Sequence, residues 1–163
     1  MNGITFTLRA LHHGERQLAK ELVVSSERHT TEHEIVHVAK DLARWSNEHC
    51  LRLAETAAHY DLDLDGPSPV SSAGPVAELR KGAAEAAGHR PEPGLLLLRD
   101  LRDLHLAAAG NSLYWEMLAQ AGQAGKDTRL QRLAASCHPQ TLRQMRWANT
   151  MIKNLAPQIL TSL

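Results

Sequence analysis

Residues 61–94 read DLDLDGPSPVSSAGPVAELRKGAAEAAGHRPEPG, and this stretch separates two long helical regions of the chain. Proline and glycine lie near both of its ends, whereas its middle, roughly residues 76–87, has the composition of a short helix. A structureless connection of this length is unusual inside a compact domain, but a segment with its own helix can run the length of a bundle. The stretch therefore predicts a long crossover between two halves of one domain.

On both sides of this crossover the chain has the composition and apolar periodicity of long helices. Leu, Ala, Arg, Gln and Glu dominate, and runs of β-branched residues are scarce. Thr31 with Glu34 and Thr128 with Gln131 have the spacing of capping boxes, which mark helix starts. The four predicted helices cover about residues 4–28, 31–60, 95–122 and 128–160.

Only a few residues join the first helix to the second, and the third to the fourth, so each pair is expected to form an antiparallel hairpin. Hairpin, long crossover, hairpin is the connectivity of ferritin-like bundles, and the whole chain, residues 1–163, resembles that superfamily in architecture. The resemblance implies a single all-α domain, a four-helix bundle whose second and third helices run parallel. The pattern leaves two alternatives open, an up-down-up-down bundle and two flexibly joined hairpins.

Composition excludes several classes of function. Lys plus Arg and Asp plus Glu both number 18, so there is no basic excess to bind nucleic acid. The longest apolar run, 95–98, is too short to span a membrane. Cys50 and Cys137 are far apart and form no C-x-x-C motif, and the N-terminal residues lack the layout of a signal peptide, so a cytoplasmic location is expected. Phosphate-binding loops and nucleophile elbows are absent, which favours a protein that is not an enzyme without deciding the matter.

One short motif points to metal chemistry. In ferritin-like di-iron proteins a Glu-x-x-His pair supplies a carboxylate and an imidazole to the metals, and Glu34 and His37 have that spacing. A helical projection, however, places His37 about 140° from Leu42 on the apolar stripe. The fourth helix cannot supply the second motif, because no Glu follows Asp127. We therefore predict that Glu34 and His37 lie on the helix surface and that the di-iron centre is incomplete.

The same projection turns a different set of polar residues toward the bundle interior. Glu15, His49, His105 and Gln144, with Thr141 as a further member, fall on the inner faces at similar levels. We predict that the first four could bind a ligand, and that Glu15, His49 and His105 could ligate iron, manganese or zinc. The favoured alternative is a hydrogen-bonded network that fixes helix register, with no cofactor.

Three functions remain open on this basis. The first is binding of a ligand or a protein partner, accompanied by self-association. Trp147, Arg143 and Tyr114 project away from the apolar stripes and predict a homodimer through the third and fourth helices. The second is a metal-binding oxidoreductase or an iron-storage-like protein that uses the inward cluster. The third is a stress-response or scaffold protein with no small-molecule site.

Two local expectations complete the sequence-based picture. Pro139 is expected to kink the fourth helix or to make it restart, because proline lacks the backbone donor. Four histidines are expected at the surface or its boundary: His12, His13, His29 and His33.

Overall fold

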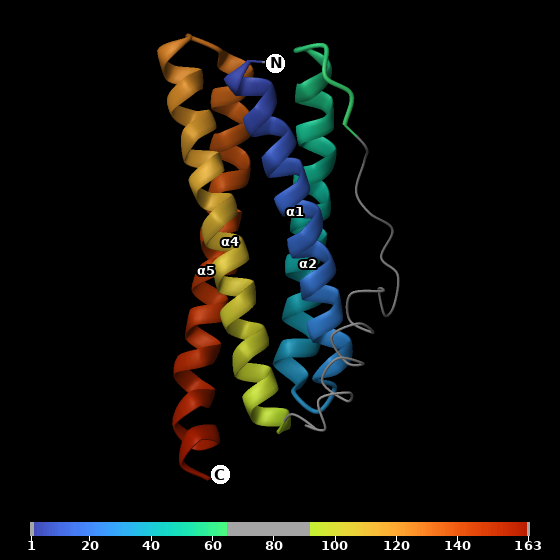
Figure 1. The fold of residues 1–163 in the computed structure, drawn as a ribbon, viewed down its shortest axis with the longest axis vertical. Helices are drawn as coiled ribbons and strands as arrows, with labels where there is room; N and C mark the ends of the chain where they lie inside the picture. Colours follow the sequence, from blue (N-terminus) through green and yellow to red (C-terminus); the bar gives the residue numbers. More distant parts are fainter. Residues whose placement is uncertain (1, 65–91, 163) are drawn as a thin grey trace.

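The computed structural model describes residues 2–64 and 92–162. These residues form four α-helices and no strand, which confirms the predicted all-α bundle (Figure 1). None of the four combines the length and apolar character that crossing a membrane requires. The predicted short helix at 76–87 lies outside the described residues. The helices are α1 (Gly3–Arg28), α2 (His33–Ala58), α4 (Pro93–Ala124) and α5 (Thr128–Thr161).

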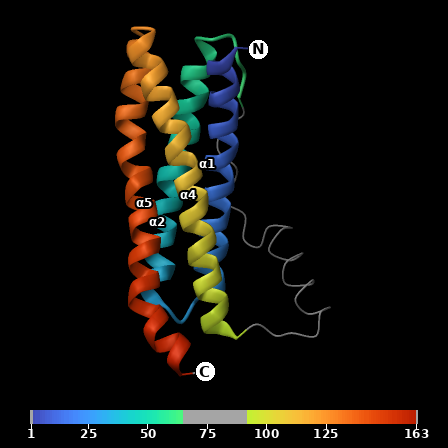
Figure 2. The ribbon, with the colours of Figure 1, turned by 60° about the vertical axis from the view of Figure 1, so that its left-hand side comes forward.

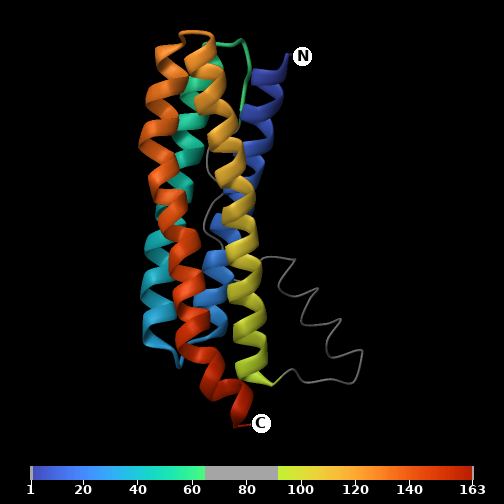
Figure 3. The same cartoon turned by 90° about the vertical axis from the view of Figure 1, so that its left-hand side faces the viewer.

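Each helix packs against two neighbours that run in the opposite direction. Helix α1 contacts α2 and α4, and α5 contacts α4 and α2 (Figures 1 and 2). The end of α1 meets the beginning of α4, since Arg28 bonds to Asp100, while Gln144 of α5 bonds to Leu42 of α2. Helices α2 and α4 therefore run in the same direction, which an up-down-up-down bundle would not allow (Figure 3).

Two of the four helix starts differ from the capping prediction. Helix α2 begins at His33 with Glu32 at the N-cap and no side-chain cap bond, so Thr31 lies before the helix and the first predicted capping box is wrong. At α5 the cap is Asp127, whose Oδ1 accepts the backbone N–H groups of Arg129 and Leu130 at 3.0 and 3.3 Å. Aspartate is as good an N-cap as threonine, and here it also accepts a hydrogen bond from the Tyr60 hydroxyl.

Helix α5 is continuous through Pro139, so the predicted restart does not occur. A proline inside a helix removes one backbone hydrogen bond, and the helix is nevertheless retained because tertiary packing fixes both sides of it. Cys137 and Thr141, on either side of Pro139, are both buried against the other helices.

The core consists of two apolar clusters with a polar layer between them. The cluster near the α1–α2 turn includes Leu18, Leu42, Leu104 and Ala148, one from each helix. The cluster at the opposite end includes Leu11, Leu53, Leu118 and Cys137, again one from each helix. Buried polar residues occupy the intervening positions on all four helices: Glu15, Ser46, His49, Asn111, Thr141 and Gln144.

A buried ionic contact joins α1 to α4 beside the α1–α2 turn. Arg28 Nη1 donates to both carboxylate oxygens of Asp100, at 3.0 and 2.9 Å. His29 Nε2 lies 2.7 Å from Asp100 Oδ2, and His29 is only 7% exposed. The expectation that His29 lies at the surface is therefore wrong, because Asp100 provides the partner that lets it be buried.

We expect Asp100→Ala to lower the free energy of unfolding by about 3 kcal/mol, because it leaves the buried His29 and the partly buried Arg28 without their acceptor. Asp103→Ala, one turn later on α4, is the matched control. Asp103 meets only the adjacent and exposed Arg102, at 3.4 Å, so its loss should cost no more than about 0.5 kcal/mol. Urea denaturation of the two variants measures the difference, and equal losses would contradict the assigned role of Asp100.

Candidate functional site

The carboxylate of Glu15 is the centre of the polar layer. Glu15 is fully buried, at 0% exposure, and its Oε1 accepts the indole N–H of Trp115 at 3.1 Å. The Thr141 hydroxyl lies 3.5 Å from the same oxygen and 3.4 Å from the Cys137 carbonyl. The other carboxylate oxygen, Oε2, is buried and makes no hydrogen bond among the described residues. One oxygen of Glu15 thus connects α1 to both α4 and α5.

His49 completes this arrangement from α2. Its Nδ1 lies 3.2 Å from Glu15 Oε1, at ion-pair distance but outside hydrogen-bond geometry. Its Nε2 lies 2.7 Å from the amide oxygen of Gln140, to which it donates. The imidazole also meets the Trp115 ring edge to face, with centroids 5.7 Å apart. All four helices therefore contribute side chains to one buried network.

The charge of Glu15 favours the protonated form of His49. Burial opposes a charged imidazole and is the largest single influence, but the hydrogen-bonding and charge effects of Glu15, with smaller effects of Gln140 and Glu48, outweigh it. The net result is a raised pKa for His49. The protonated form of His49 is therefore favoured beside Glu15 relative to a free imidazole.

Gln144 lies in the same layer but bonds elsewhere. It is 3% exposed, and its Nε2 donates to the backbone carbonyl of Leu42 at 3.0 Å and to Ser46 Oγ at 2.9 Å. The amide therefore ties α5 to α2, and no described hydrogen bond links it to Glu15. The sequence placed Gln144 at the right level and did not identify its partners.

His105, the third predicted metal ligand, lies apart from Glu15 and His49. Its ring is half-buried and Nδ1 lies 3.1 Å from the Met145 carbonyl oxygen. The prediction estimated the level of each residue from the rise per residue alone, whereas in the structure Arg28, at the end of α1, is level with Asp100. Because of this shift of α4 along α1, Trp115 lies beside Glu15, where His105 was expected. A buried tryptophan N–H needs an acceptor, and that requirement is the signal that could have identified Trp115.

Two of the three predicted metal ligands, Glu15 and His49, are thus brought together. Within residues 2–64 and 92–162, no group of three or more His, Cys, Asp or Glu side chains is placed to hold a metal ion. Glu34 and His37 are both exposed on α2, as the helical projection predicted. The geometry of the layer is that of an ion pair held by neutral donors and acceptors.

The two cysteines are unsuited to nucleophilic chemistry. Both Cys50 and Cys137 are buried, and burial raises the pKa of each thiol to about 12. Cys50 donates a weak hydrogen bond to the His12 carbonyl over 3.9 Å. His12 itself is 4% exposed, so its predicted place at the surface boundary is wrong, while His13 and His33 are exposed as predicted. Thiols with such a pKa stay protonated at neutral pH and react slowly.

The aromatic residues expected to anchor a dimer are not fully exposed. Trp147 packs against the cluster near the α1–α2 turn, and Tyr114 packs against the opposite cluster. Arg143 is exposed as predicted. The projection overestimated the exposure of both rings because a large side chain at the edge of a helical face can lie back onto the neighbouring helix.

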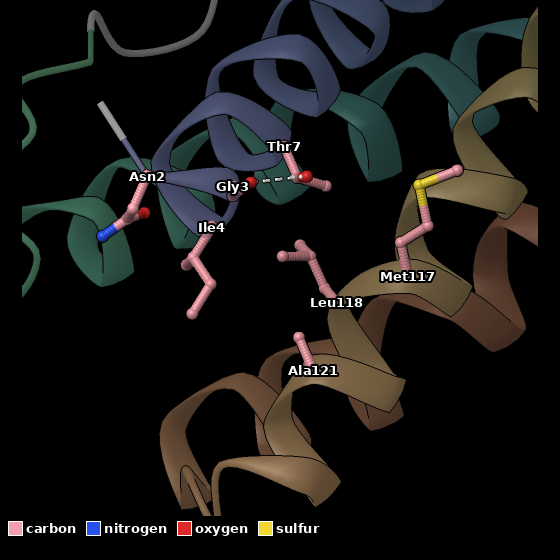
Figure 4. A pocket seen from close by; sticks show the side chains of 7 residues that line it. All are labelled: Asn2, Gly3, Ile4, Thr7, Met117, Leu118 and Ala121. Carbon is pink, nitrogen blue, oxygen red and sulfur yellow. Dashed lines mark hydrogen bonds between the residues drawn. The ribbon is translucent and has the colours of Figure 1, made fainter.

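A pocket of about 430 Å³ lies between the start of α1 and the end of α4, away from the polar layer (Figure 4). Its polar side chains are already bonded within α1: Asn2 accepts the Thr5 N–H, and the Thr7 hydroxyl donates to the Gly3 carbonyl. The pocket therefore offers mainly apolar contact and holds no charged side chain among its described lining residues. It is lined by Asn2, Gly3, Ile4, Thr7, Met117, Leu118 and Ala121.

The fold and the site define a class of protein, an all-α four-helix bundle with a buried carboxylate–imidazole pair at its centre. The chain matches no protein-family model, and comparisons with curated proteins and with solved structures found no similar protein.

We expect Glu15→Ala to lower the free energy of unfolding by about 3 kcal/mol, because His49, Trp115 and Thr141 all lose the same partner. Glu48→Ala is the matched control, since Glu48 is exposed, pairs with Arg52 at 3.2 Å along the surface of α2, and has only a small charge effect on His49 among the described residues. Its loss should cost no more than about 0.5 kcal/mol. Chemical denaturation checks both values. A loss at Glu15 as small as that at Glu48 would mean that the network does not hold the helices.

The raised pKa of His49 makes stability depend on pH. A group whose pKa rises on folding stabilises fully below its unfolded value, about 6.5, and loses this effect as the pH rises through the folded value. We therefore expect the stability advantage of the native protein over Glu15→Gln/His49→Gln to shrink from pH 6 upward, by at most about 1.4 kcal/mol per pH unit.

Unfolding curves at pH 6, 7 and 8 measure this advantage. His37→Gln, at an exposed position on the same helix, is the control and should run parallel to the native protein. An advantage that is constant or grows with pH would show that His49 is not buried as an imidazolium.

Proposed function

We propose that the protein is a ferritin-like bundle in which a buried ion pair, Glu15 with His49, stands where ferritin-like di-iron proteins hold two metals. On this proposal it works by binding a partner or a ligand at its surface, in the cytoplasm, and it is not an enzyme. The parallel direction of α2 and α4, with antiparallel neighbours throughout, supports the ferritin-like connectivity and a crossover between residues 64 and 92.

One observation carries the proposal: Glu15 Oε1 is already engaged from three helices. Trp115, Thr141 and His49 all lie within 3.5 Å of this oxygen. A di-metal centre needs carboxylate oxygens and imidazole nitrogens whose lone pairs face the metals. Here the imidazole nitrogens face Gln140 and Glu15. The Trp115 indole N–H is a donor with no lone pair to offer a metal, and it occupies Glu15 Oε1.

The outer surface supports binding. Large apolar side chains are exposed on α4, at Leu106, Leu113 and Met117, and Met117 also lines the apolar pocket. Apolar groups that remain in water on one side of a bundle are typical of a contact surface. Chemistry at the centre has no such support, because Glu15 and His49 are 0% and 1% exposed.

A second candidate function is binding of iron, manganese or zinc. It is supported by the surroundings of one atom of the polar layer. Oε2 of Glu15 is buried and makes no hydrogen bond among the described residues. A buried carboxylate oxygen without a donor is unusual, and a cation would satisfy it. The candidate needs further ligands besides His49, and the predicted third ligand, His105, is bonded to the Met145 carbonyl.

Elemental analysis decides between the two. We expect untagged protein, purified without chelators from cells grown with added iron, manganese and zinc, to contain far below one metal per chain after dialysis. We also expect its melting temperature to be unchanged by these metals, since a ligand that binds only the folded state would raise it. One or two metals per chain, lost in Glu15→Ala and kept in the exposed-site control Glu34→Ala, would replace the first proposal with the second.

A further inference from the structure

The outward face of α4 carries an apolar stripe that no described helix covers. Leu106, Leu113 and Met117 are 51%, 63% and 54% exposed. They lie within about 40° of one another around the helix, since each residue turns it by about 100°. Figures 2 and 3 show α4 at the front of the bundle with no other described helix over that side.

Gly110 lies between Leu106 and Leu113 along the helix, and no contact among the described residues explains a glycine there. A Cβ at Gly110 would meet no atom within 4 Å, so an alanine would fit. Glycine weakens an exposed helix relative to alanine. Gly14 differs, because a Cβ there would collide with the side chain of Asn111. A glycine that its own chain does not require, between two exposed leucines, allows another helix to approach closely from outside.

The charges beside the stripe indicate which helix fits. Arg102 and Glu116 lie on the same flank of α4, at opposite ends of the stripe, with side chains 69% and 56% exposed. Among the described residues Arg102 pairs with its neighbour Asp103, at 3.4 Å. Glu116 is 3.7 Å from His138 Nδ1 and accepts a hydrogen bond from Gln120 at 3.3 Å. When two copies of α4 pack antiparallel about a twofold axis, the flank that carries Arg102 and Glu116 lies beside the same flank of the other copy. Because the two helices run in opposite directions, the end with Arg102 then meets the end with Glu116.

We propose that α4 packs antiparallel against α4 of a second copy of this chain, across a twofold axis beside Gly110. Leu106 then faces Leu113 of the partner subunit, and Arg102 faces Glu116 of the partner subunit. The leucine pair is centred between Ala109 and Gly110 and the charged pair on Ala109, so the two centres differ by only half a residue, about 0.75 Å along the helix. Apolar contact, charge and close approach therefore favour nearly the same register. This inference rests on the proposed surface-binding function and names its partner.

Sedimentation velocity of the full chain tests whether the dimer forms through this face. We expect a concentration-dependent dimer for the native protein. Gly110→Leu should weaken it at least tenfold, because the added side chain blocks the approach while meeting nothing in its own subunit. Helix α2 offers a matched control in Leu51→Lys, which alters another exposed leucine (50%) and should leave the dimer unchanged. A native protein that stays monomeric at high concentration would overturn the proposal.

Charge reversal tests the register. Arg102→Glu places Glu opposite Glu116 of the partner subunit, and Glu116→Arg places two arginines together, so each variant alone should dimerise at least tenfold more weakly. The double variant, and an equimolar mixture of the two single variants, should return to within about threefold of the native affinity, since opposite charges face again. Arg52→Glu on α2 is the control.

Circular dichroism confirms folding of every variant. A dimer that the reversals leave unchanged, or that neither the double variant nor the mixture restores, would overturn this interface. These results do not bear on the elemental analysis, which tests the proposed function separately. A failed dimer with no bound metal would overturn this interface alone, whereas bound metal would overturn the proposed function.

Discussion

The structure depends on a charge that has no access to water. Glu15 is fully buried, and a carboxylate in such a place is stable only when nearby groups replace its hydration. His49 supplies the opposite charge, while Trp115 and Thr141 supply donors. Because these partners come from three other helices, each helix can take only one axial position relative to α1. Apolar packing alone would tolerate sliding by a turn, and the polar layer does not.

This constraint explains why the centre is closed as well as polar. The carboxylate of Glu15 and the imidazole of His49 lie against each other, and neutral side chains such as Gln140 and Thr141 provide the remaining polar contacts. Polar side chains thus occupy the middle of the bundle, while exposed apolar side chains lie on the outer face of α4. The polar layer fixes the register of the helices from inside, and the outer face of α4 takes no part in it.

Much of the fold could be predicted from sequence because periodicity reports directly on which face of a helix is buried. Glu15, His49 and Gln144 were placed in the interior on that basis, and all three are buried. Periodicity says nothing about how far one helix slides along another, and this offset decided that Trp115 rather than His105 reaches Glu15. Nor could it show that Thr31 precedes the cap of α2, or that the Trp147 ring folds back onto the core.

The polar layer also divides the interior into two compartments that differ in composition. The compartment near the α1–α2 turn is filled mainly by aliphatic side chains, whereas the other also holds Trp115 and Cys137. The two clusters share none of their buried residues. Substitutions more than about 7–10 Å apart without common partners usually combine additively. Evolution can therefore alter the volume of one compartment without compensating changes in the other, and the bundle can tolerate sequence drift at one end while the opposite end is held constant.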